Sequence, residues 1–190
     1  MKDVYDAVKH IHENAGEFGI DPNKICLAGT SGGAYVSLGA SIMMGRNNES
    51  HLVKSLHLHC PMLSCQYKDV KDEDLEPWES PENQMIIAMI KCSASDWEKQ
   101  IKENDVFLFP GQLSVEDAKK LPMTVIFAAE FEPPRRDIAV FEEIMKKTDR
   151  LVGIHTMPGV RHEYYYFFHQ QESKWYWEDL AHVFKETVLN

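Results

Sequence analysis

The sequence predicts an α/β fold with one mainly parallel sheet and flanking helices, and two features of the 190-residue chain carry this prediction. Short apolar runs without polar alternation are typical of parallel strands covered on both faces. Segments with apolar residues at helical spacing lie between these runs, and such alternation indicates strands joined by helical crossovers. A hydrophobic content of 44% with 26% charged residues is ordinary for one globular domain.

The first part of the chain is expected to form a helix, a strand and a second helix. Asp3 can cap the first helix and Gly19 can end it in a left-handed conformation. Residues 25–28 are a short apolar run, which predicts a buried strand. Residues 31–44 are apolar nearly all round, so this helix is expected to lie deep in the domain. The apolar positions that define the first helix are Val4, Val8, Ile11, Ala15 and Phe18.

The second part continues the alternation after an interruption. Residues 64–120 contain an acidic, Pro-containing loop and short helical pieces, one opened by a capping box at residues 95–98. We interpret this segment as a cap-like insertion in a single domain that spans residues 1–190. The expected strands are residues 56–63, 123–129 and 152–157, with a helix around Ile138 and Phe141 and a closing helix over residues 175–189.

Charge and composition exclude several classes of protein. The formal charge of −10 argues against a nucleic-acid partner, because a surface that follows phosphates needs clustered Lys and Arg. The longest apolar stretch, residues 85–90, is far shorter than the ~20 residues of a membrane span, and the chain does not begin with a signal peptide. Four cysteines without CxxC spacing suggest buried apolar groups in a reducing compartment, which predicts a cytoplasmic protein.

The motif GTSGG at residues 29–33 lies where a predicted strand meets a predicted helix, which is the setting of a nucleophile elbow. So tight a turn exposes the Ser31 hydroxyl, and a side chain at Gly29 or Gly33 is expected to collide with it. The N–H of Gly32, at the helix start, is then aimed at a developing oxyanion. Two alternatives are an N-capping Ser31 and a phosphate-binding loop, although the latter needs a Lys where Ala34 stands.

A serine nucleophile needs a histidine base, which in this kind of fold follows the acid along the chain. His162 comes just after the last predicted strand, where α/β sheets place their ligands, and is the expected base. His155 alternates within that strand and is expected to pack. His57 and His59 share one face of a strand and could bind a metal, but no third ligand is evident. We therefore expect no metal and no cofactor.

The acid is expected in the loop after residues 123–129, where Glu130, Glu132 and Asp137 are the candidates. Residues 129–133, AEFEP, resemble the AEFDP segment of the hormone-sensitive-lipase-like esterases, members of the α/β-hydrolase superfamily. The elbow segment DPNKICLAGTSGGA and the segment LPMT before the strand are also similar to that family. In the family the residue before Pro is the acid, so the resemblance implies Glu132 in place of the usual Asp. The following segment is one residue longer here, which leaves Asp137 as an alternative.

The resemblance implies an α/β-hydrolase fold and a triad of Ser31, Glu132 and His162, with Gly32 as oxyanion donor. The implied function is a serine carboxylic-ester hydrolase, esterase- or lipase-like, that acts through an acyl-enzyme on a small acyl ester. The alternatives are an inactive hydrolase-like structural or interaction subunit and a serine peptidase of the same fold. Only the C-terminal part of the family's domain is matched, without its HGG loop and N-terminal strands. A missing N-terminal half or another chain is therefore expected to complete the sheet.

Overall fold

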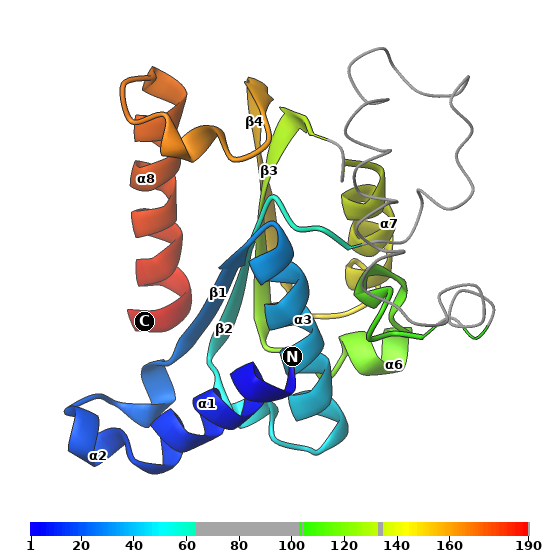
Figure 1. Cartoon of the computed structure of the whole chain (residues 1–190), viewed down its shortest axis with the longest axis vertical. Helices are drawn as coiled ribbons and strands as arrows, with labels where there is room; N and C mark the ends of the chain where they lie inside the picture. The colour runs from blue at the N-terminus through cyan, green and yellow to red at the C-terminus, as the bar shows by residue number, and fades with distance from the viewer. Residues whose placement is uncertain (64–102, 104, 133–134, 190) are drawn as a thin grey trace.

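The computed structural model describes residues 1–63, 103, 105–132 and 135–189. Most of the predicted insertion, including the capping box at residues 95–98, lies outside these ranges. The described residues form a four-stranded parallel sheet with helices on both faces, which confirms the predicted α/β class (Figure 1). None of the helices in the described ranges combines the length and the apolar character that crossing a bilayer requires.

The strands lie side by side in chain order: β1 (Cys26–Thr30), β2 (Ser55–His59), β3 (Met123–Phe131) and β4 (Leu151–Arg161). The two inner strands are the most buried, as expected of apolar runs between two layers of helices. β1 and β4 form the two edges of the described sheet. All strands run parallel, so their carboxyl ends meet at one edge of the sheet, where the candidate site lies.

One face of the sheet is covered by α3 (Gly32–Arg46), α6 (Val115–Ala118) and α7 (Arg135–Met145). Their shared core is fully buried and contains Leu38, Ile42, Leu56, Ile126 and Phe141. The depth predicted for the second helix is confirmed, because most of α3 is buried. Outside α3 lies α1 (Lys2–Glu13), whose Val8 packs with residues of α3, and α2 (Ala15–Phe18) follows it in the chain.

The opposite face is covered by α8 (Gln171–Phe184), which continues as a π-helical turn over Lys185–Leu189 (Figure 1). The core between α8 and this face of the sheet is rich in aromatic rings. Phe127 of β3 packs there among Tyr164, Tyr165 and Tyr176. Short 3-10 turns make several connections: η1 (Pro22–Lys24), η2 (Ser50–Leu52), η4 (Pro110–Gln112) and η5 (Tyr164–Tyr166).

Two helix predictions need correction. The first helix starts at Lys2, so Asp3 lies inside its first turn and is not the cap. It also breaks at Asn14, which has a non-helical φ of −111° and ψ of 23° and whose backbone N–H and side-chain amide both donate to His10 O, at 3.0 and 2.8 Å. The prediction for Gly19 is confirmed, because this residue ends α2 with a left-handed φ of 66°.

Two strand ends differ from the predictions by four residues each, and the other strand boundaries by two residues or fewer. β2 ends at His59, since Cys60 has a φ of 43° and Pro61 has no N–H to continue the ladder. β4 continues to Arg161, beyond the predicted end at residue 157. Pro158 is tolerated inside β4 because that strand lies at the sheet edge, where a missing N–H costs no ladder bond.

Two histidines on β2 face α8 and should make the fold sensitive to acid. His57 and His59 are 1% and 6% exposed, and the His59 Nδ1 lies 2.7 Å from the Tyr176 hydroxyl. Burial, reinforced by a neighbouring histidine in each case, lowers the pKa of both from 6.5 to about 4. The folded state therefore disfavours the protonated rings, whereas the unfolded chain takes up protons near pH 6.5.

We expect the free energy of unfolding to be independent of these histidines above pH 6.5 and to fall as the pH drops from 6.5 toward 4. The loss should be on the order of 2 kcal/mol per histidine by about pH 4.5. Urea unfolding at several pH values measures it, and His59→Gln should reduce the slope. An unchanged slope in that variant would show that other groups cause the acid sensitivity.

Candidate active site

Ser31 occupies the sharp turn between β1 and α3. Its φ of 52° and ψ of −118° are uncommon for a residue with a side chain, as expected of a strained elbow. The Ser31 N–H donates to His59 O at 2.9 Å, which ties the turn to the end of β2. Ser31 makes no side-chain capping bond to α3, so the N-cap alternative is not supported. Gly32 is the first residue of α3, so its N–H has no partner within the helix.

The two glycines that flank the elbow differ in the space around them. A Cβ built on Gly29 would lie 2.3 Å from Gly33 O and 2.7 Å from Ala34 N, so a side chain at this position is excluded as predicted. A Cβ on Gly33 would meet nothing within 4 Å among the described residues. The expected collision at Gly33 is therefore wrong. A side chain on Gly29 would collide with the backbone of Gly33, whereas a side chain on Gly33 would not collide with the described residues.

Ser31, His162 and Glu132 lie in hydrogen-bonding contact although they are far apart in the sequence. The Ser31 Oγ is 2.9 Å from His162 Nε2, and His162 Nδ1 is 2.9 Å from Glu132 Oε2. These partners fit the neutral tautomer in which Nδ1–H donates to the carboxylate and Nε2 accepts from the hydroxyl. His162 directly follows β4 and Glu132 directly follows β3, so adjacent parallel strands deliver both side chains.

Glu132 is held in place on both carboxylate oxygens. Its side chain is fully buried, and Oε1 accepts the Ala129 N–H at 2.8 Å while Oε2 faces His162. The other two acid candidates lie elsewhere. Glu130 Oε2 accepts the Gly159 N–H at 2.7 Å, and Asp137 is buried in the first turn of α7. The structure thus brings Glu132, and not Glu130 or Asp137, to the histidine.

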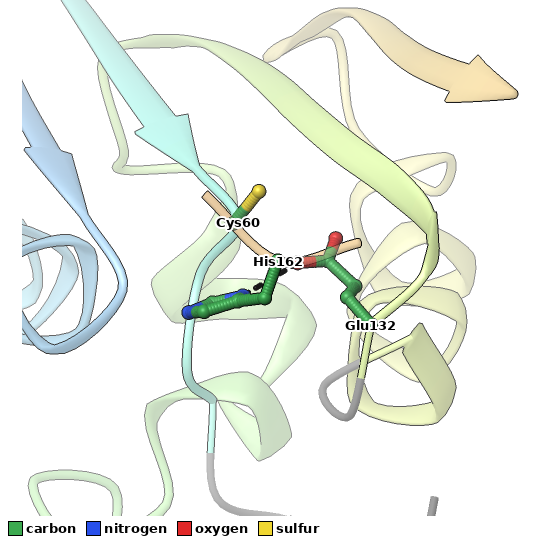
Figure 2. A group of neighbouring side chains, drawn as sticks. All are labelled: Cys60, Glu132 and His162. Carbon is green, nitrogen blue, oxygen red and sulfur yellow. Dashed lines mark hydrogen bonds and ion pairs between the residues drawn. The ribbon is translucent and has the colours of Figure 1, made fainter. Parts of the chain in front are cut away.

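Cys60 joins this group although the sequence suggested only a small buried apolar residue. Figure 2 shows its thiol at the end of β2, beside the pair formed by Glu132 and His162. One ligand atom from each of these three residues lies within 4.8 Å of the other two. Burial raises the pKa of the Cys60 thiol well above its usual value, and the charge of Glu132 raises it further. No local signal in the sequence indicated this role, because Cys60 lies in the middle of the strand predicted at residues 56–63 and only the observed β2 ends just before it.

A second set of contacts braces the residues next to the nucleophile and the histidine. The Thr30 hydroxyl donates to Glu163 Oε1 at 3.4 Å and also hydrogen-bonds the Tyr165 hydroxyl. The carbonyl of Tyr165 in turn accepts from Ser173 Oγ of α8 at 2.8 Å. Since Thr30 precedes Ser31 and Glu163 follows His162, these bonds fix the elbow relative to the histidine loop.

In the described part of the chain, His162 is the histidine whose side chain hydrogen-bonds Ser31, and the three other histidines considered in the sequence contact different groups. His155 stacks on Phe127 at 5.0 Å between ring centroids and contacts Asp179 at 2.7 Å, consistent with the packing role predicted from its strand position. His57 contacts the Thr187 hydroxyl at 3.0 Å. Within the described ranges, neither His57 nor His59 belongs to a group of three residues spaced to hold a metal ion.

The chain is similar to known proteins in both sequence and structure. A family model described as alpha/beta hydrolase fold matches residues 1–166. An arylesterase of Saccharolobus solfataricus is 26% identical over 133 residues, which are 70% of this chain and 42% of that protein. A hyperthermophilic esterase from the archaeon Pyrobaculum calidifontis superimposes with a TM-score of 0.82 at 22% identity, over 97% of this chain and 59% of that one.

A second solved structure is covered to a similar extent. Carboxyl esterase 2 of the mycorrhizal fungus Tuber melanosporum has a TM-score of 0.75 at 23% identity, over 96% of this chain and 60% of that one. The chain therefore corresponds to about three fifths of the length of these solved relatives. The structural likeness agrees with the fold predicted from the motifs, in which the first strands of the family's sheet are missing.

Proposed function

The chain belongs to the alpha/beta hydrolase fold family, and we propose that it is the nucleophile-bearing part of a serine carboxylic-ester hydrolase. One observation carries the proposal: an unbroken path of hydrogen bonds runs from the Ser31 hydroxyl through His162 to the buried Glu132 carboxylate. A hydroxyl is a poor nucleophile at neutral pH unless a positioned base takes its proton. The esterase names of the relatives support an ester as substrate.

In the proposed reaction, His162 Nε2 accepts the Ser31 proton as Oγ attacks the acyl carbon. The Gly32 N–H, at the start of α3, stabilises the negative charge that develops on the carbonyl oxygen. His162 then returns the proton to the leaving alcohol, which yields an acyl-enzyme on Ser31. Water, deprotonated by His162, then attacks the acyl carbon, and His162 returns the proton to Ser31 Oγ as the bond to the acyl group breaks and the acid leaves.

Glu132 serves as the acid that orients the base. Its Oε2 accepts from Nδ1–H and so keeps the unprotonated Nε2 directed at Ser31. Its negative charge also stabilises the imidazolium that forms during the reaction. Because Ala129 N–H holds the other carboxylate oxygen, Glu132 has little freedom to turn away from His162.

We also propose that a further strand pairs with β1 in the working protein, supplied by upstream sequence or by another chain. β1 is an edge of the described sheet, and an apolar groove of about 520 Å³ lies beside it, under α8. The groove is lined by Ala28, Trp177, Leu180, Phe184 and Leu189, among others. This chain alone should self-associate or aggregate, since exposed strand edges pair readily. A monodisperse, well-folded monomer in sedimentation experiments would count against the proposal.

Labelling with a fluorophosphonate probe tests the function directly. The probe reacts with activated serines, so we expect one adduct per chain in the protein with its completed sheet. Ser31→Ala should abolish the adduct, while Ser37→Ala, which removes a buried hydroxyl of α3 that donates to Ala28 O, should retain it. Absence of labelling in a folded protein would favour the alternative of an inactive structural subunit.

A further inference from the structure

We propose that Cys60, Glu132 and His162 form an inhibitory site for a thiophilic divalent cation, with Zn²⁺ as the fitting ion (Figure 2). Such a site is additional to the ester hydrolysis proposed above, which needs no metal. The binding of the ion depends only on the geometry of the three side chains. Its inhibitory effect rests on the proposed function.

The three residues supply the ligand types and the spacing that Zn²⁺ prefers. Zn²⁺ is bound by Cys sulfur, His nitrogen and carboxylate oxygen at roughly 2.0–2.3 Å, which separates neighbouring ligand atoms by about 3.3–3.7 Å in a tetrahedron. The ligand atoms here lie within 4.8 Å of one another, and Nδ1 and Oε2 are already 2.9 Å apart. Small side-chain rotations therefore suffice to enclose an ion.

The three residues stand on neighbouring parts of one rigid framework. Cys60 follows β2, Glu132 follows β3 and His162 follows β4, so three adjacent strands fix their relative positions. Cys60 and Glu132 are fully buried, while the His162 side chain is 25% exposed. The ion would therefore enter from solvent past His162. A water molecule would fill the fourth coordination position.

Charge balance favours an ion in this position. The Glu132 carboxylate is buried, and the neutral His162 ring donates a hydrogen bond to it. When Zn²⁺ binds, the Cys60 thiol releases its proton to solvent, so that a thiolate and a carboxylate together balance the two positive charges. The metal thus replaces a partly compensated buried charge with a neutral cluster.

Binding through Nδ1 would stop the proposed reaction for a specific reason. Because a neutral imidazole carries a single N–H, its proton must move from Nδ1 to Nε2 when Nδ1 binds the metal. Nε2–H donates to the Ser31 hydroxyl in place of accepting from it, so His162 no longer acts as a base. Zn²⁺ binding needs an unprotonated Nδ1 and catalysis needs an unprotonated Nε2, so the two exclude each other.

Cobalt spectroscopy tests the site without reference to activity. Co²⁺ replaces Zn²⁺ in such sites, and a thiolate ligand gives an intense near-ultraviolet charge-transfer band. We expect this band at one Co²⁺ per chain, displaced by Zn²⁺. Cys60→Ser should abolish it, whereas the matched control Cys26→Ser, which alters the half-buried thiol of β1, should retain it. Cys65→Ser and Cys92→Ser complete the set, so that every thiol of the chain is tested.

Each result decides the proposal. Loss of the band in Cys60→Ser, together with Zn²⁺ affinity at least about tenfold weaker in Glu132→Gln, supports it. Absence of a band, or a band that persists in Cys60→Ser, overturns it and leaves adventitious binding by other side chains. Should Cys60→Ser fail to fold, Glu132→Gln provides the same decision through its Zn²⁺ affinity.

The functional consequence has a separate readout. Zn²⁺ should slow fluorophosphonate labelling of Ser31 by at least about tenfold, and a chelator should restore the rate. If the metal-free protein is not labelled at all, the proposed function fails while the cobalt band still tests the site. If labelling is fast and Zn²⁺ leaves it unchanged although the band is present, the inhibitory role fails.

Discussion

Glu132→Gln is expected to lower kcat for hydrolysis of a short-chain p-nitrophenyl ester by about 10³–10⁴-fold. The amide has nearly the shape of the carboxylate, so the buried packing is kept. Its NH₂ group, however, donates to Nδ1 and forces the imidazole proton onto Nε2, which faces Ser31. The loss therefore comes from the wrong tautomer, and KM should change little.

Asp137→Asn is the matched control, because it makes the same chemical change at the other acid proposed from the sequence. Asp137 is also buried, but it lies in α7 and the His162 nitrogens face Ser31 and Glu132. We expect kcat within a few-fold of the unaltered protein once both variants are shown to be folded. A large loss in Asp137→Asn with a small one in Glu132→Gln would reverse the assignment of the acid.

Gly29→Ala should disrupt the elbow and abolish labelling of Ser31. The added methyl would lie 2.3 Å from Gly33 O, which is backbone and cannot rotate away. Relief requires β1 and the start of α3 to separate, at a cost of roughly 3 kcal/mol in the free energy of unfolding, or more. Urea unfolding and the rate of fluorophosphonate labelling measure the two effects.

Gly33→Ala provides the comparison within the same motif. Nothing in the described residues lies within 4 Å of the new methyl, and alanine in a helix is favoured over glycine by about 0.5–1 kcal/mol. We expect unchanged or slightly higher stability. Equal destabilisation by the two substitutions would show that the close contact between Gly29 and Gly33 does not hold the elbow.

Much of this arrangement could be predicted because local chemistry decides it. The glycines of the elbow, the apolar runs and the position of His162 after the last strand are all visible in single segments. The choice of the acid among Glu130, Glu132 and Asp137 could not be made from a single segment. It depends on where β3 ends and on the direction in which the next residues turn. The family motif singled out Glu132, and in the structure Glu132 is the residue that contacts His162.

The features that were missed depend on tertiary packing. The length of β4 was underestimated because Pro158 normally interrupts a strand, and only the edge position makes it acceptable. Cys60 gave no local sign of its neighbours, since its approach to Glu132 and His162 is set by the register of three strands. The break at Asn14 also had no local signal in the apolar spacing, which continues through Ala15 and Phe18.

The most direct test of the central claim is detection of the covalent intermediate. The protein, with its sheet completed, is mixed with an activated short-chain ester, quenched in acid and digested with trypsin, which releases residues 25–46 as one peptide. We predict an added acyl mass localised to Ser31, absent in Ser31→Ala and formed far more slowly in Glu132→Gln. Acyl groups at other residues only, or ester turnover that survives Ser31→Ala, would contradict the proposed chemistry.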